Sequence, residues 1–114
     1  MSYTDSSPPD TTHLDIHVED EPDGIRVVVS GEVDMSTADD LRLALDAADR
    51  QSGGDVLLDF AGLRFIDSCG LRELLLAARR ARRSGRRLKA MNTPPHIRRL
   101  FELTAIDQSI ELAR

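Results

Sequence analysis

The first part of the chain alternates apolar and polar residues in the way that β-strands do. Residues 13–19 read HLDIHVE, which predicts a half-buried strand. Residues 25–30 read IRVVVS and predict a second, more apolar strand. The turn sequence EPDG that joins them is short, so we expect the two strands to form an antiparallel hairpin.

Two helices are predicted in the middle of the chain, where apolar residues recur every three or four positions. Ser36 followed by Asp39 resembles an N-cap with an acid in the first helical turn, and Gly53-Gly54 predicts the end of this helix. The second helix follows Asp67-Ser68 and is predicted to end near Ser84-Gly85. The apolar faces of the two helices are Ala38, Leu41, Leu45 and Ala48, and Leu71, Leu74, Leu75 and Ala78.

Short apolar runs predict the remaining strands. Residues 56–60 read VLLDF, which is typical of a strand that is covered on both faces. Residues 88–91 and 109–113 predict two further strands. Between these two, Thr93-Pro94 predicts the start of a third helix with proline at its first position, and the buried face of that helix is Ile97, Leu100 and Phe101.

The resulting order, β-β-α-β-α-β-α-β, predicts an α/β fold with a mixed sheet of four to five strands and helices packed against it. We expect a disordered tail over residues 1–12 and a single domain over residues 13–114. If the second and third strands are parallel neighbours, Asp34 and Asp67-Ser68 lie on one rim of the sheet. Sites in α/β proteins usually form at that rim.

Composition mainly excludes classes of protein. The net charge of −5 argues against a general nucleic-acid binder. The sequence contains no apolar run near the roughly 18 residues that span a bilayer, and its first residues do not resemble a secretory signal. We therefore expect a soluble cytoplasmic protein. The single cysteine, Cys69, excludes an internal disulfide and a cysteine-only metal site.

The stretch FIDSCGL at residues 65–71 carries the candidate chemistry. Ser68 can be read as part of a helix cap. It can also be read as a phosphoacceptor whose phosphate faces free backbone N–H groups and the positive end of the helix dipole. A catalytic serine is disfavoured because Ile66 replaces the first glycine of G-x-S-x-G, and no feature marks His13, His17 or His96 as a general base. We predict that the protein is not an enzyme.

Three stretches resemble the bacterial anti-sigma factor antagonists, which are small STAS-domain proteins. LRFIDSCGL at residues 63–71 is similar to their phosphorylation-site signature. GEVD at residues 31–34, followed by Thr37-Ala38, is similar to the segment after their second strand, and RLFELT at residues 99–104 resembles a helix near their C-terminus. The resemblance covers about residues 13–113.

The resemblance implies a partner-switching role. The unphosphorylated antagonist binds an anti-sigma factor that is also a serine kinase, which frees a sigma factor; phosphorylation of Ser68 releases the kinase. A metal-dependent serine phosphatase acting on phospho-Ser68 restores the antagonist. The resemblance implies no cofactor, metal or catalytic residue, and we expect a monomer or weak dimer that binds neither nucleic acid nor membrane. The implied partner-binding residues are Asp34, Thr37, Asp67, Ser68, Cys69, Gly70 and Arg72.

Two departures and one alternative complete the prediction. Cys69 stands where the family usually has serine or threonine, which leaves Ser68 as the only acceptor in the motif, and Ala105 replaces a common glycine. The alternative is a STAS-type adaptor or scaffold subunit of a larger complex without regulatory phosphorylation. The basic run is read either as a solvated helix end or as a docking surface for an acidic partner; it comprises Arg79, Arg80, Arg82, Arg83, Arg86, Arg87 and Lys89.

Overall fold

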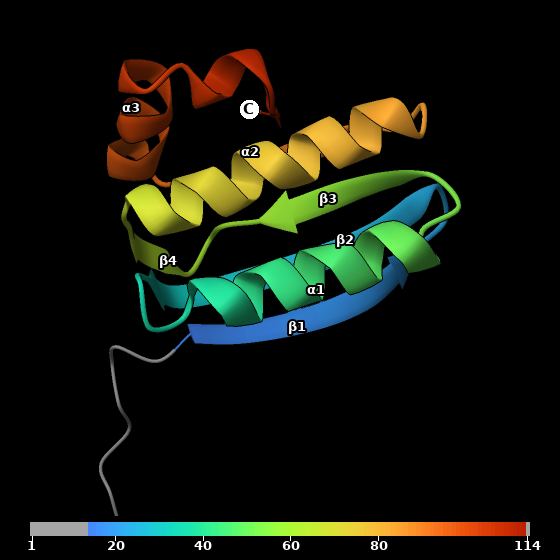
Figure 1. Ribbon diagram of the computed structural model, residues 1–114, viewed down its shortest axis with the longest axis horizontal. Helices are drawn as coiled ribbons and strands as arrows, with labels where there is room; N and C mark the ends of the chain where they lie inside the picture. Colours follow the sequence, from blue (N-terminus) through green and yellow to red (C-terminus); the bar gives the residue numbers. More distant parts are fainter. Residues whose placement is uncertain (1–13, 114) are drawn as a thin grey trace, which may run out of the picture.

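The computed structural model describes residues 14–113, and these form a mixed sheet with two long helices on one face (Figure 1). The predicted tail at residues 1–12 lies outside the described residues. The elements are β1 (Leu14–Glu21), β2 (Gly24–Val33), α1 (Ala38–Gln51), β3 (Asp55–Asp59), β4 (Leu63–Ile66), α2 (Ser68–Arg83), β5 (Leu88–Met91), α3 (Pro95–Leu103), the short 3₁₀ helix η1 (Ile106–Gln108) and β6 (Glu111–Leu112).

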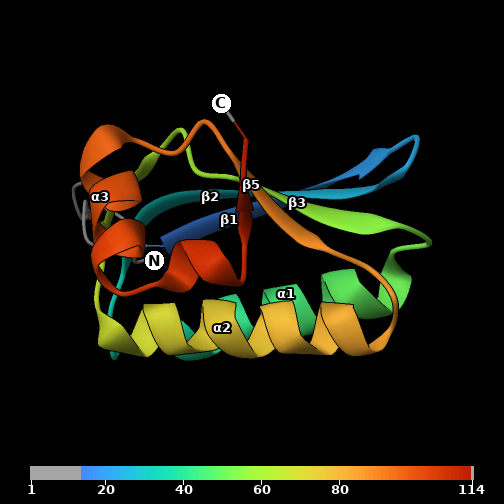
Figure 2. The same cartoon turned by 90° about the horizontal axis from the view of Figure 1, so that it is seen from above.

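Within residues 14–113 the sheet has six strands, in the order β1-β2-β3-β5-β6 with β4 paired to β2. The predicted hairpin is confirmed because β1 and β2 are antiparallel, and all other pairs are parallel. Figure 2 shows α1 and α2 side by side beneath the sheet, with α3 across one end. The α/β class and the order of elements are therefore as predicted, with β4 as an additional strand.

The core lies between the sheet and the pair α1 and α2. Alternate residues of β2, among them Val27 and Val29, are fully buried toward the helices. The four residues predicted for the buried face of α1 are the four that are buried. The buried face of α2 differs, because Leu71 and Leu75 are only partly buried while the small residues Gly70, Ala77, Ala78 and Ala81 are buried together with Leu74.

The helix starts differ from prediction in two places. The N-cap position of α1 is Thr37, not Ser36, and no side chain caps the helix. The Ser36 hydroxyl instead donates a hydrogen bond to the Asp34 carboxylate, at 2.6 Å. Ser36 is therefore held in the loop and does not cap the helix. Helix α3 begins at Pro95, one residue later than predicted. Its Phe101 ring packs edge-to-face on the Phe60 ring, with the ring centroids 5.9 Å apart.

Asp55 links β3 to β5 and makes stability depend on pH. Its carboxylate accepts the Arg87 backbone N–H at 3.0 Å and pairs with Lys89 at 3.2 Å. The Arg87 hydrogen bond, with a smaller contribution from Lys89, lowers the pKa of Asp55 in the folded chain. A lowered folded pKa stabilises the fold above the unfolded pKa, about 3.9, and this stabilisation is lost as the pH falls through the folded value.

We therefore expect Asp55→Asn to lose about 0.5–1 kcal/mol at pH 7, where this half-exposed link is intact in the wild type. Below about pH 4 the difference from the wild type should shrink. Urea unfolding at a series of pH values measures this. Glu102→Gln, at an exposed position on α3, controls for the loss of one charge; the same change in slope in both variants would contradict the assignment.

Candidate functional site

The carboxyl ends of β2 and β4 meet at one end of the sheet. Val33 is paired with Ile66, and the Asp67 N–H donates to the Val33 carbonyl at 3.0 Å. Asp34 and Asp67 follow these strand ends directly, so both lie on the same rim. The predicted rim is confirmed, but the strand that carries Asp67 to it is β4 and not the predicted third strand, which is β3.

The start of α2 separates the roles of Asp67 and Ser68. Asp67 is the N-cap, and its Oδ1 accepts the N–H groups of Cys69 at 2.9 Å and Gly70 at 3.2 Å. Ser68 is the first helical residue and is exposed, and its hydroxyl makes no hydrogen bond with residues 14–113. The cap, which is worth about 0.5–2 kcal/mol, therefore belongs to Asp67. Within residues 14–113, the Ser68 hydroxyl has no hydrogen bond to lose.

This arrangement corrects one expectation. The sequence predicted free N–H groups at the helix start that a phosphate on Ser68 could face. The N–H groups of Cys69 and Gly70 already donate to the Asp67 carboxylate. A phosphate at Ser68 would stand next to a carboxylate that holds these donors, so its charge would not be neutralised by them.

The loop after β2 places a second carboxylate on the rim. Asp34 accepts hydrogen bonds from the Ser36 hydroxyl and the Ser36 N–H, at 2.6 and 2.9 Å. The Ser36 hydroxyl is the main cause of a lowered pKa of Asp34, which is therefore ionised at neutral pH. Thr37 fixes the loop, because its hydroxyl accepts the Asp34 N–H at 3.0 Å and donates to the Glu32 carbonyl at 3.1 Å.

Gly70 holds the start of α2 against the sheet. A Cβ at this position would lie 2.6 Å from Ile66 Cγ1 and 2.6 Å from Val33 Cγ1, so only glycine fits without movement. Among the other predicted site residues, Arg72 and Ser68 are exposed and Asp34, Thr37, Asp67 and Cys69 are partly exposed. The residues predicted for the site therefore come from the loop after β2 and from the start of α2, and Gly70 is buried beneath them.

Two apolar residues near the rim were missed by the sequence prediction. Met35 directly follows Asp34 and is 82% exposed, and Phe65 lies two residues before Asp67 and is 47% exposed. Large exposed apolar side chains beside polar groups are common in protein interfaces. The sequence signal for Met35 was only its position between polar loop residues, which does not report exposure.

The described residues offer Ser68 no catalytic partner. His96 is bonded to the Arg64 carbonyl at 2.8 Å, and His17 pairs with Glu19 at 3.2 Å. Within residues 14–113 no group of three or more His, Cys, Asp or Glu residues could hold a metal ion. None of the helices in this part of the chain combines the length and apolar character needed to cross a membrane.

Comparison with known proteins gives consistent relatives. The sequence model of a family described as "Mlab, STAS domain" matches residues 16–113. BtrV of Bordetella bronchiseptica, whose name marks it provisionally as an anti-sigma factor antagonist, is 33% identical over 75% of this chain and 74% of its own. The anti-sigma-B factor antagonist of Bacillus subtilis is 26% identical over 89% of this chain and 92% of its own.

Among solved structures, an anti-sigma factor antagonist from Mycobacterium paratuberculosis is similar with a TM-score of 0.80 and 29% identity. The match covers 93% of this chain and 88% of that one. The similarity therefore extends over nearly all of both chains, including the rim that carries Asp34 and Ser68.

Proposed function

The chain belongs to the STAS-domain family, and from this we propose that it is an anti-sigma factor antagonist that is switched by phosphorylation at Ser68. Unphosphorylated, it binds an anti-sigma factor with serine kinase activity in the cytoplasm and so frees a sigma factor. The kinase phosphorylates Ser68 and is released, and a metal-dependent serine phosphatase reverses the modification. The proposed binding surface comprises Asp34, Thr37, Asp67, Ser68, Cys69 and Arg72, and the buried Gly70 holds the start of α2 in place beneath it.

The observation that carries this proposal is the free hydroxyl of Ser68. The side chain is exposed on the first residue of α2, while Asp67 performs the capping. A kinase can therefore modify Ser68 without breaking a side-chain hydrogen bond of the described residues. The relatives are named as anti-sigma factor antagonists, which supports the proposed role as an antagonist.

The charge of one phosphate is enough to release the kinase from the proposed complex. The group adds about −1.5 to −2 charges at neutral pH, next to the Asp67 carboxylate and on the same rim as Asp34. Reversing a complex from 99:1 to 1:99 occupancy needs about 5.5 kcal/mol. Burying one unpaired charge in an interface costs roughly 3–5 kcal/mol, and a phosphate carries more than one.

The direct test is to incubate the chain with ATP and the anti-sigma factor kinases of its source organism, and to locate any phosphate by mass spectrometry. We expect a single modified residue, Ser68, and no modification of a Ser68→Ala variant. Incubation of the phosphorylated chain with a metal-dependent serine phosphatase should restore the original mass.

The same experiment addresses the alternative role as an adaptor subunit of a larger complex. An adaptor would not be modified by these kinases, and its Ser68→Ala and Ser68→Asp variants would bind partners like the wild type. This combination of results would overturn the switch.

A further inference from the structure

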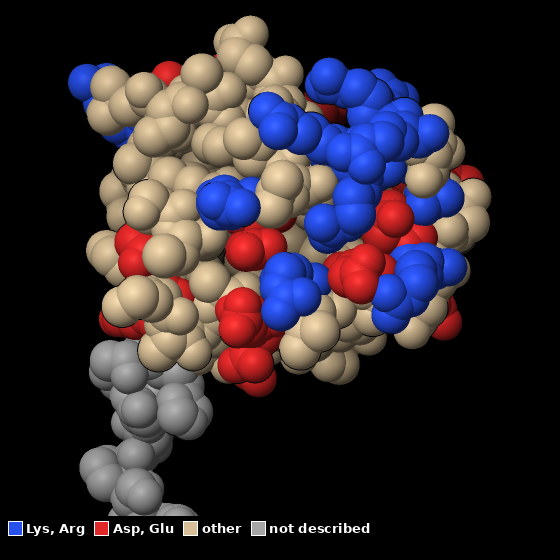
Figure 3. Space-filling model, viewed as in Figure 1, with Lys and Arg blue, Asp and Glu red and all other residues tan. Residues whose placement is uncertain are grey.

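The charges of this chain are separated into two regions. Residues 13–67 carry 14 acidic and 4 basic side chains, whereas residues 68–114 carry 4 acidic and 11 basic ones. In Figure 3 the basic side chains gather over one part of the visible face, and acidic side chains lie below and beside them. We call Arg79, Arg82, Arg83, Arg86 and Arg87, at and beyond the C-terminal end of α2, the basic pole.

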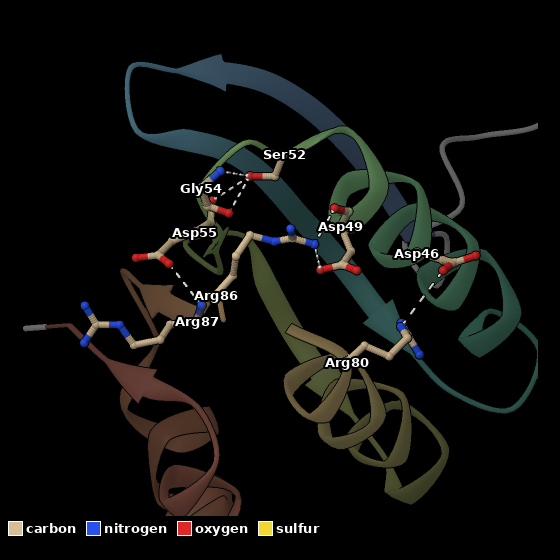
Figure 4. A network of polar contacts seen from close by, with 8 residues as sticks. All are labelled: Asp46, Asp49, Ser52, Gly54, Asp55, Arg80, Arg86 and Arg87. Atoms are coloured by element: carbon tan, nitrogen blue, oxygen red, sulfur yellow. Dashed lines mark hydrogen bonds and ion pairs between the residues drawn. The ribbon is translucent and has the colours of Figure 1, made fainter. Parts of the chain in front are cut away.

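Part of this cluster is explained by contacts within the fold. Arg86 Nη2 donates to the Asp49 carboxylate and carbonyl, both at 2.9 Å, and Arg80 points across the helix pair toward Asp46 (Figure 4). Arg87 pairs with Glu111 at 3.2 Å. These contacts join α2 and the loop that follows it to α1 and β6.

The remaining arginines have no such explanation. Arg79, Arg82 and Arg83 are exposed and make no ion pair or side-chain hydrogen bond within residues 14–113. Cations in the last turn of a helix gain about 0.3–1 kcal/mol from the helix dipole. Arg82 and Arg83 lie in that turn, whereas Arg79 lies before it. The dipole therefore favours cations at this end of α2 but does not account for all three unpaired arginines beside the already paired Arg86 and Arg87.

A hollow of about 260 Å³ lies beside these arginines. Its apolar part is formed by the buried residues Ala78, Leu88 and Ile110. Its charged edge has three arginines, Arg82, Arg86 and Arg87, and two acids, Asp107 and Glu111, of which Glu111 is paired with Arg87. Pockets for drug-sized ligands usually measure about 300–1,000 Å³. A smaller hollow with an apolar floor, beside exposed arginines, fits one apolar side chain of an acidic peptide better than a free small molecule.

The basic pole is remote from the candidate phosphorylation site. Helix α2 runs from Ser68 to Arg83, and its 16 residues separate these ends by about 22 Å at 1.5 Å per residue. The Debye length at physiological ionic strength is about 8 Å, so charge at Ser68 is screened at the basic pole. Two surfaces so separated can be occupied independently.

We propose that the basic pole is a second docking surface, which binds an acidic segment of a partner protein with one apolar side chain in the hollow. The positive charge of the basic pole favours an acidic segment, and the apolar floor of the hollow favours one apolar side chain within it. Binding there does not depend on the phosphorylation state of Ser68. The proposal therefore concerns a different end of α2 from the proposed switch and does not rest on it.

The test uses a fluorescein-labelled synthetic peptide of glutamates around one central leucine, with the full chain titrated into it and anisotropy measured. We expect saturable binding that weakens about tenfold in the double variant Arg82→Glu/Arg83→Glu. Both side chains are exposed and unpaired, so the variant should melt like the wild type. The double variant Arg42→Glu/Arg99→Glu, with the same change in charge at two other exposed positions, and Ser68→Asp should each bind within about twofold of wild type.

Several results would overturn the proposal. One is the absence of binding to the wild type, and another is an equal loss in the two double variants, which would indicate attraction by net charge alone. Undiminished binding of a peptide with alanine in place of leucine, together with competition by single-stranded DNA, would indicate a general polyanion surface. Salt-sensitive self-association through the basic pole that excludes the peptide would identify a second copy of this chain as the occupant.

Discussion

Replacement of Gly70 by valine is expected to lower the free energy of unfolding by about 1–3 kcal/mol or more. Even a Cβ at this position would lie 2.6 Å from atoms of both Val33 and Ile66. These two side chains are buried, in neighbouring strands that pair with each other. Urea unfolding, analysed by linear extrapolation, measures the loss.

The control for this prediction is Gly53→Ala. A Cβ at Gly53 would have no atom within 4 Å. The free energy of unfolding of the Gly53→Ala variant should therefore stay within about 0.5 kcal/mol of the wild-type value. Similar losses at the two positions would show that α2 does not rest on β2 and β4 as described. A Gly70 variant that remains folded should also bind the anti-sigma factor more weakly, because displacement of the helix start moves Ser68.

The periodic parts of the fold could be predicted from the sequence. The buried face of α1 follows from Ala38, Leu41, Leu45 and Ala48, because helical spacing alone places them on one side. The strand β2 follows from a run of β-branched residues between turn signals. The rim followed as well, since parallel neighbours joined by right-handed crossovers end on one side of a sheet.

The parts that could not be predicted depend on contacts between distant residues. β4 has only four residues and no alternation, since its burial pattern is buried, exposed, exposed, buried. Asp67 and Ser68 are equally good caps by propensity. The choice falls on Asp67 because the bond from its N–H to the Val33 carbonyl keeps it in an extended conformation, so the helix can begin only at Ser68.

The same limit applies to the charges. The sequence shows a dense run of arginines, but it does not show that Arg86, which follows α2, reaches Asp49 on α1, 37 positions away. The packing of α1 against α2 and the place of β6 beside β5 separate the arginines with structural partners from Arg79, Arg82 and Arg83. The candidate site was predicted at the level of its loops, whereas the exposure of Met35 required the structure.

Replacement of Ser68 by aspartate is expected to abolish binding of the anti-sigma factor kinase while leaving the fold intact. The Ser68 side chain is exposed and makes no hydrogen bond within the described residues. The free energy of unfolding should therefore change by about 1 kcal/mol or less, which corresponds to a shift of a few degrees in the melting temperature. An acid in the first turn of a helix is also favoured by the dipole, which offsets repulsion from Asp67. In the complex, the added carboxylate would be buried near Asp34 and Asp67, at a cost of roughly 3–5 kcal/mol. Binding should therefore weaken by a factor of several hundred or more, which calorimetric titration of the kinase can measure.

Two variants separate the effect of position from that of charge. Ser68→Ala removes the hydroxyl without adding charge, so it should bind the kinase like the wild type and resist release by ATP. Gln51→Glu adds one negative charge at the exposed far end of α1 and should leave binding unchanged. If Ser68→Asp unfolds the chain, the serine is structural in spite of its free hydroxyl. If Ser68→Asp folds and binds normally, the rim is not the switched surface, because one carboxylate at its centre would then be tolerated in a buried interface.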